Sequence, residues 1–203
     1  MEESIYPNET LQTIFQRRSI RQFQDRPVSD DLIRIILDAA NQAPSAHNQQ
    51  SWKFVVIRNE KKQELARLVS KQAAGFPKPS TSILRMAGRS IGSAPVVIAA
   101  MNTGTLIEHG TELFQIEAEP ALDFFRTMEI QSSAAAVENL LLAATSLGLG
   151  SVWLGILFLI KREVLSFLGE QQGEFMAVIP IGYPQREASG PKKQTLEYVV
   201  KNL

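Results

Sequence analysis

The chain has 203 residues, of which 44% are hydrophobic and 21% charged, and its 21 basic side chains balance its 21 acidic ones. This composition predicts one soluble globular domain over residues 1–203, with no nucleic-acid or membrane partner. The sequence has no cysteine, which excludes disulfides and thiolate chemistry, and its two histidines, His47 and His109, are too few for an ordinary zinc site. If the chain is an enzyme, we expect a bound organic cofactor to carry the reaction, so we assign neither a catalytic side chain nor a metal ligand.

Apolar spacing and capping residues predict the secondary structure along the chain. Asn8 is the expected cap of a helix ending at Gln16, and Ser29 that of a helix ended by Ala43 and Pro44. Residues 102–119 are expected to form a loop with a partial helix. Because helices and strands intermix, the pattern predicts an α+β fold with a mixed central sheet flanked by helices. The other helices are expected over Glu60–Lys71, Ser132–Leu147 and Arg162–Leu168, and the strands over Trp52–Ile57, Ala94–Met101, Ser151–Leu154, Phe175–Ile181 and Thr195–Val200.

One stretch, Asn139–Ile160, carries no charge and is long enough by count to span a bilayer. Three glycines interrupt it, so we interpret it as a buried helix, a turn and a buried extended segment. The N-terminal Met1–Tyr6 carries two glutamates and lacks the apolar core of a secretory signal. We therefore expect a cytoplasmic protein.

The segment Arg17-Arg18-Ser19-Ile20-Arg21 places three cations and a hydroxyl within five residues of a neutral protein. Arginine offers paired donors that suit phosphate, and serine adds a directional hydrogen bond, so the segment is a candidate site for a specific anion. A solvated basic patch that closes a helix is the alternative, because cations are favoured at that end of the helix dipole.

Two further segments are candidates for ligand contact. The polar loop from Ala43 to Trp52 lies between a helix and a strand, although its Ser and Asn side chains could simply satisfy their own backbone. Gly148–Gly155 partly mimics a dinucleotide fingerprint but follows a helix instead of opening one, so it fails as a Rossmann loop. It could instead let the backbone approach a flat ligand, or form only a tight turn.

Taken together with the basic pair in Pro191-Lys192-Lys193, these segments resemble the FMN-dependent nitroreductase family. The matching motifs are RRSIR, APSAHNQQSW, ENLLLAATSLGLGSVWLG and IPIGYPQ, and they cover about 14–60 and 130–200. The resemblance implies a nitroreductase-like fold and an intertwined homodimer with FMN at its interface. Residues about 70–128 match no motif, and we expect this variable region to shape the acceptor pocket. Its Phe114, Phe124 and Phe125 could stack on planar acceptors or pack in the core.

The resemblance also implies roles for individual residues. Arg17, Arg18 and Ser19 match positions that hold the FMN phosphate and ribityl chain, and Arg21 matches a basic position near the N1/O2 edge of the ring. Leu154 and Gly155 match backbone positions that face the ring. The loop bordering the flavin, expected from the partner subunit, is matched by Pro44, Ser45 and Asn48, and the terminal phosphate clamp by Lys193 with Lys192.

The sequence departs from the family pattern at three points. Ser51 replaces a proline of the loop motif, and Ser132 stands where many relatives carry an acidic or amide residue, which would alter the cofactor pocket. The terminal clamp is usually arginine, and lysine keeps its charge without the paired geometry.

The implied activity is an NAD(P)H-dependent FMN oxidoreductase that works in two half-reactions at one flavin. NADH or NADPH would donate hydride, and a nitroaromatic, a quinone or a related conjugated acceptor would then take the electrons. Alternatives on the same fold are a flavin-binding carrier or sensor without turnover, and a dehalogenating or flavin-fragmenting relative. A phospholigand module without flavin is a further alternative, and whether His47 takes part in catalysis stays open.

Overall fold

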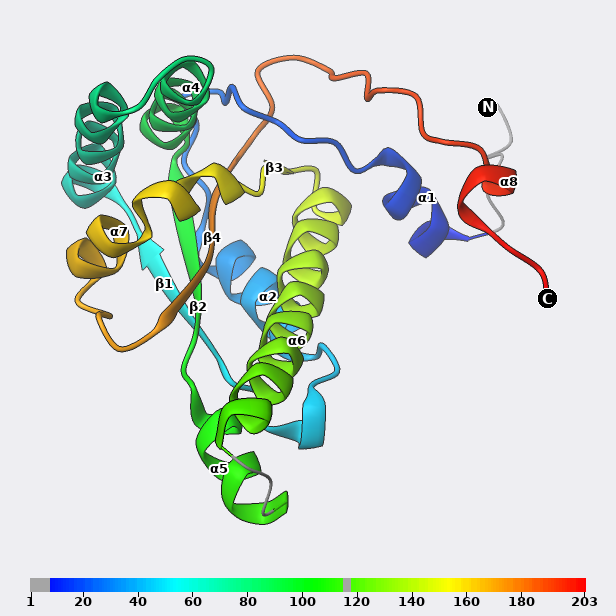
Figure 1. The fold of residues 1–203 in the computed structure, drawn as a ribbon. Coiled ribbons are helices and arrows are strands. Elements are labelled where there is room, and N and C mark those ends of the chain that lie inside the picture. The colour runs from blue at the N-terminus through cyan, green and yellow to red at the C-terminus, as the bar shows by residue number, and fades with distance from the viewer. Residues whose placement is uncertain (1–7, 115–117) are drawn as a thin grey trace.

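A four-stranded sheet forms the centre of the structure, a computed structural model that describes residues 8–114 and 118–203 (Figure 1). Its strands lie in the order β1 (Trp52–Ile57), β2 (Val96–Asn102), β4 (Glu174–Gly182) and β3 (Gly150–Ser151). All three pairings are antiparallel. A parallel bridge joins Ser19 to Ser151 at the β3 edge. The α+β class is confirmed, and the parallel part of this sheet is confined to that bridge.

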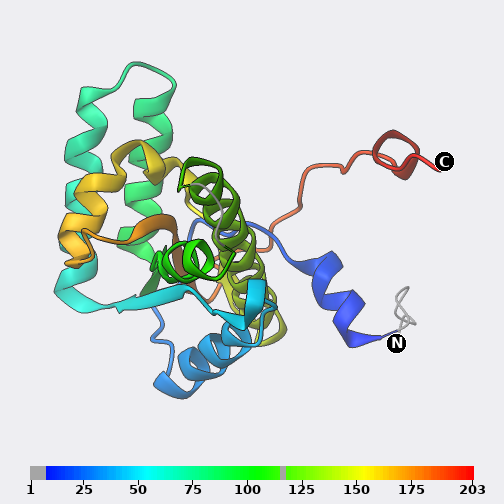
Figure 2. The same ribbon diagram turned by 60° about the horizontal axis from the view of Figure 1, so that its bottom comes forward.

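Helices cover both faces of the sheet (Figures 1 and 2). Strand β2 is buried along its whole length, and its residues alternate between two cores. Val97, Ala99 and Met101 belong to the core under α3, α4 and α7, whereas Val96 and Ile98 belong to the core under α2 and α6. The helices are α2 (Asp30–Asn41), α3 (Asn59–Gln72), α4 (Ser80–Ser93), α6 (Ala118–Ser146) and α7 (Lys161–Leu168).

Side-chain caps fix the helix ends much as the sequence predicts. Asn8 Oδ1 accepts a hydrogen bond from Leu11 N at 2.9 Å at the start of α1 (Glu9–Gln16). Ser29 Oγ accepts from Leu32 N at 3.4 Å at the start of α2. Gly169 ends α7 in the left-handed conformation, with φ of 73°.

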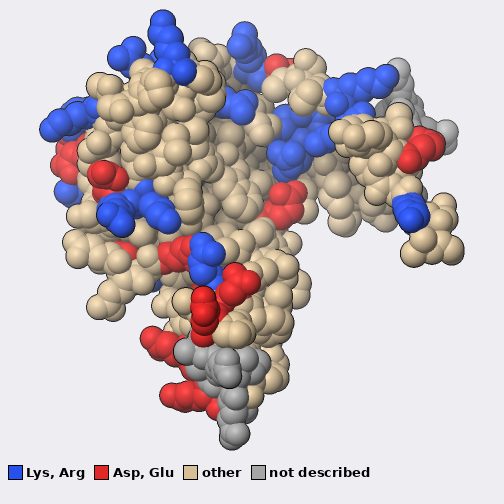
Figure 3. Space-filling model, in the orientation of Figure 1, with Lys and Arg blue, Asp and Glu red and all other residues tan. Residues whose placement is uncertain are grey.

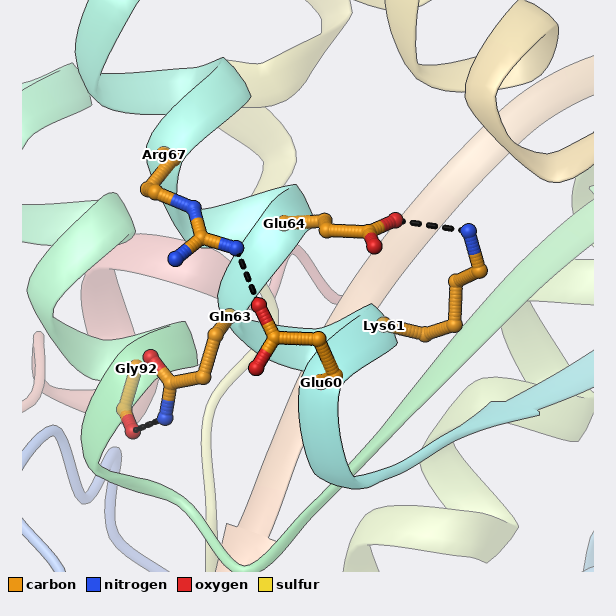
Figure 4. A network of polar contacts seen from close by, with 6 residues as sticks. All are labelled: Glu60, Lys61, Gln63, Glu64, Arg67 and Gly92. Carbon is orange, nitrogen blue, oxygen red and sulfur yellow. Dashed lines mark hydrogen bonds and ion pairs between the residues drawn. The ribbon is translucent and has the colours of Figure 1, made fainter.

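Figure 4 shows polar contacts of α3, one of which reaches α4. Gln63 Nε2 donates to Gly92 O at 3.1 Å, which links the two helices. Lys61 pairs with Glu64 at 2.6 Å, and Arg67 with Glu60, on the exposed side of α3. Such exposed pairs contribute about 0–1 kcal/mol each, so apolar packing dominates here.

Several expected elements are corrected by the structure. Residues 195–200 contain the short helix α8 (Leu196–Val199) in place of a last strand, because they lie away from the sheet and have no strand partner there (Figure 1). The strand expected over Ser151–Leu154 is the two-residue β3, and the 3-10 helix η3 (Gly155–Ile160) begins directly after Leu154.

The variable region is more helical than its sequence indicates. It contains α4, which we did not expect, and α5 (Thr105–Phe114) where we expected a loop with a partial helix. The predicted helix Ser132–Leu147 is the second half of α6, which has 29 residues. Within the described part of the chain, no helix combines the length and the apolar character needed to cross a membrane.

Candidate functional site

Cations from distant parts of the sequence meet in one pocket with a volume of about 740 Å³. Arg17, Arg18, Ser19 and Arg21 line it from the N-terminal side, and Lys193 lines it from the segment after β4. Figure 3 shows Lys and Arg side chains gathered where α1 and the C-terminal segment leave the body. We call this the cation pocket. It brings together five of the residues that the sequence singled out.

The sheet edge holds the basic segment in place. After α1 ends, Ile20 N donates to Ser151 O at 2.9 Å, and Phe23 forms a bridge to Pro184. A Cβ atom at Gly150 would lie 2.6–2.8 Å from the side chain of Ile20, so the two segments approach as closely as only glycine allows. The segment is therefore fixed on the sheet, not mobile in solvent.

The arginines of the pocket have different partners. Arg18 Nη1 donates to Phe15 O at 2.6 Å and to Arg17 O at 2.8 Å, so its guanidinium is engaged by backbone carbonyls. Arg17 Nε lies 3.7 Å from Glu138 Oε1, and the Glu138 side chain is 51% exposed, which makes this a weak pair. Glu138 is the acidic residue of the lining, and six side chains there, those of Arg17, Arg18, Ser19, Arg21, Ser189 and Lys193, can donate to an anion.

A second groove of about 580 Å³ adjoins the cation pocket and shares Ser19, Arg21 and Ala188 with it. Arg89 of α4 and Arg186 also line this groove, and its lining residues include no carboxylate. Arg89, Arg186 and Glu138 were not among the predicted site residues. Proximity to the Pro191–Lys193 segment could have pointed to Arg186, and Glu138 is the first residue of the ENLLLAATSLGLGSVWLG motif, but no local pattern marks Arg89.

The polar loop lies elsewhere in this chain. Ala46–Asn48 forms one 3-10 turn, and Ala46 N donates to Ser132 Oγ at 3.1 Å, which ties the loop to α6. Ser45 Oγ accepts from Gln50 N at 3.1 Å. Pro44, Ser45, Asn48 and Ser132 are absent from the lining of the cation pocket.

The remaining predicted positions follow β3. Leu154 is buried and its N–H donates to Val178 O at 3.0 Å, whereas Gly155 is exposed at the start of η3. A Cβ at Gly155 would meet only Trp153, at an ordinary 3.7 Å, so packing within this chain does not require glycine. Lys192 is exposed and does not line the cation pocket beside Lys193.

Comparisons with known proteins, by sequence and by structure, indicate the same family. The model of the nitroreductase family matches residues 14–183. A protein of Archaeoglobus fulgidus, provisionally named NADH dehydrogenase/NAD(P)H nitroreductase, is 33% identical over 185 residues, which cover 88% of this chain and 87% of that one.

Solved structures give the same result. A nitroreductase with bound FMN from Desulfitobacterium hafniense is similar with a TM-score of 0.74 at 25% identity, over 98% of this chain and 100% of that one. The NADPH:FMN oxidoreductase from Vibrio harveyi, complexed with NAD+, is similar with a TM-score of 0.75 at 25% identity, over 96% of this chain and 77% of that one.

Proposed function

Because this chain belongs to the nitroreductase family, we propose that it is an FMN-dependent oxidoreductase that uses NADH or NADPH. Its acceptors are nitroaromatics, quinones or related conjugated electrophiles, and it works in the cytoplasm. The observation that carries the proposal is the cation pocket, in which Arg17, Arg21 and Lys193 converge although Arg21 and Lys193 are 172 positions apart in the sequence.

The pocket suits the phosphate end of FMN. A phosphate group takes guanidinium, ammonium and hydroxyl donors, and Arg17, Arg18, Ser19 and Lys193 supply all three kinds. Glu138 opposes an anion, but its half-exposed carboxylate is screened by solvent, so the cations dominate. Lys192, next in sequence, adds positive charge nearby.

When bound, FMN supplies the redox chemistry, because its ring system accepts hydride and releases electrons to an acceptor. The chain's own residues bind and orient it. Arg21, which lines both adjoining pockets, would supply a fixed positive charge that favours negative charge on the bound cofactor. Leu154 and Gly155 closely follow β3, the strand that bridges to the basic segment at Ser19, and the exposed Gly155 would leave room for a flat ring.

A second copy of the chain completes the site in this proposal. Pro44, Ser45 and Asn48 lie with Ser132 beside α6 and not in the cation pocket of the same chain, so we propose that the partner's loop borders the cofactor. An interface also explains the exposed apolar side chains of the C-terminal segment, where Leu196 and Tyr198 are 72% and 77% exposed.

Absorption spectroscopy of the purified protein tests this function. We expect a yellow protein with a flavin spectrum that bleaches without oxygen when NADH or NADPH is added, and that recovers with a quinone or a nitroaromatic. A colourless protein that takes up no FMN would refute the proposal. A flavin that neither nicotinamide reduces would favour a carrier or sensor. Light scattering that gives the mass of one chain would exclude the shared site.

A further inference from the structure

A carboxylate lies buried in the variable region. Glu129 on α6 has an exposed fraction of 0%, and its Oε1 accepts a hydrogen bond from Leu106 N at 2.8 Å. Leu106 is in the first turn of α5, whose N–H groups have no partner within their own helix. Glu129 therefore caps α5 from a neighbouring helix.

The surroundings of this carboxylate are unusual. Among the described residues no cation pairs with it, and the Ser51 hydroxyl is the polar side chain that favours its charged form. Burial raises the pKa of Glu129, while the N–H of Leu106 is the largest influence in the opposite direction. Burial of a carboxyl group without a cation beside it lowers the stability of the folded chain, so packing alone does not explain the position of Glu129.

The α5 helix that Glu129 holds reaches the polar loop at its other end. Phe114, the last residue of α5, packs edge-on against the His47 ring with centroids 5.2 Å apart, and against Phe125 of α6 at 5.6 Å. Nearer the middle, a Cβ at Gly110 would lie 2.4 Å from the Phe125 ring. The close fit means that a shift of α5 would move Phe114.

The loop contacted by Phe114 needs such support. His47, Asn48 and Gln50 have φ values of 51°, 54° and 50°, the left-handed region that non-glycine residues avoid. Residues in that region persist only where their surroundings hold them, and they gather at functional sites. Ala46 in the same loop packs against the cluster of Leu106, Ala121 and Phe125 under α5.

We propose that Glu129 is a positioning residue that holds α5, and through Phe114 the His47 loop, in the arrangement that an electron acceptor meets. This inference deepens the proposed function and rests on it for the identity of the acceptor. Glu129 does not line the cation pocket, which is proposed to bind the phosphate end of FMN, so its effect falls more on the use of acceptor than on cofactor binding. Bulky planar acceptors, which need an ordered aromatic wall, depend on it most.

The test compares Glu129→Ala with Glu129→Gln, whose carbonyl oxygen still accepts from Leu106 N, and with Phe114→Ala. Glu112→Ala is the control, because Glu112 is an exposed carboxylate on α5, the helix that Glu129 holds. Stopped-flow kinetics on the FMN-loaded protein separates flavin reduction by NAD(P)H from reoxidation by a nitroaromatic. Hydrogen exchange of α5 and of the 45–50 loop gives a readout that needs no flavin.

For Glu129→Ala we expect faster exchange in the first turn of α5 and in the loop, and reoxidation slowed about tenfold, equivalent to one lost buried hydrogen bond. FMN content and flavin reduction should stay within about twofold of the original protein, equivalent to about 0.4 kcal/mol, because Glu129 lies outside the cation pocket. Glu129→Gln should keep the hydrogen exchange and the reoxidation rate of the original protein, and Glu112→Ala should change neither of them.

Phe114→Ala should slow reoxidation to a similar degree but leave exchange at the first turn of α5 unchanged. Because both residues act in one chain of contacts, the double variant should be no slower than the worse single variant. Additive effects, equal slowing of both half-reactions, or loop exchange unchanged in Glu129→Ala would overturn the inference. A chain without flavin would refute the proposed function while leaving the exchange test of this coupling intact.

Discussion

The cation pocket is made of charged residues that are half-buried or exposed, whereas the α5–α6 hairpin is held by a buried carboxylate and a cluster of rings. In the pocket, Arg17, Arg21 and Lys193 each act as a charge, so the loss of one leaves the others in place. In the hairpin, Glu129 holds α5, and Phe114 of α5 holds the His47 loop, so the position of each residue depends on the contact before it. The comparison suggests that ligand affinity resides in the first region and selectivity between acceptors in the second.

The largest effect is expected from Arg17→Ala combined with Arg21→Ala. Each removed cation deletes a charge-assisted contact of about 1.5–3 kcal/mol, so FMN affinity should fall at least about 100-fold and the protein should purify without cofactor. Titration with FMN, followed by absorbance, measures this loss.

A matched control for that variant is Arg34→Ala with Arg67→Ala, since both side chains are exposed and lie outside the pocket. Stoichiometric FMN in the Arg17 and Arg21 double variant would disprove the assignment of the pocket. It would also mean that ligand affinity does not reside in the cation pocket, so the two regions would not differ in the way proposed.

A smaller change is expected from Glu138→Gln. The substitution removes the negative charge beside Arg17, so an anionic phosphate should bind about two- to fivefold more tightly, in line with the weakness of exposed pairs. Because salt screens exposed charges, the gain should shrink as ionic strength rises. Isothermal titration at two salt concentrations measures it, and weaker FMN binding by the variant would show that Glu138 supports the site.

The smallest expected effect is a change of slope in the pH dependence of stability. Burial raises the pKa of Glu129, so the folded chain holds this proton to higher pH than the unfolded chain does. The stability of the original protein relative to Glu129→Gln should therefore be greatest in acid and fall as pH rises through the folded-state pKa. Urea unfolding of both proteins at several pH values measures this difference, and a difference that grew with pH would contradict the buried environment.

The N-terminal part of the cation pocket could be predicted from residues that are neighbours in the sequence. Asn8 and Ser29 marked helix starts because caps act over a few residues, and the RRSIR motif was visible because its residues are adjacent. The convergence of Lys193 with Arg17 came from the family resemblance, because no local signal reports contacts over such a separation.

The hairpin was not predictable for the opposite reason. Glu129 reads as an ordinary surface carboxylate on a helix, and only the packing of α5 over it reveals that it is buried. Apolar side chains at 196–200 resembled a strand, but a strand needs a partner, and the chain has left the sheet by that point. Tertiary contacts therefore decided both outcomes.

One consequence of the cation pocket concerns the order in which a ribosome makes the chain. Arg17 to Arg21 emerge early, and the final strand of the sheet is complete at Gly182, still short of Lys193. Both hydrophobic cores are made of residues that precede Lys193, so a chain that ends before Lys193 still contains them. Such a shortened product would keep Arg17 to Arg21 and lack one cation of the pocket, so it should hold FMN more weakly than the full chain.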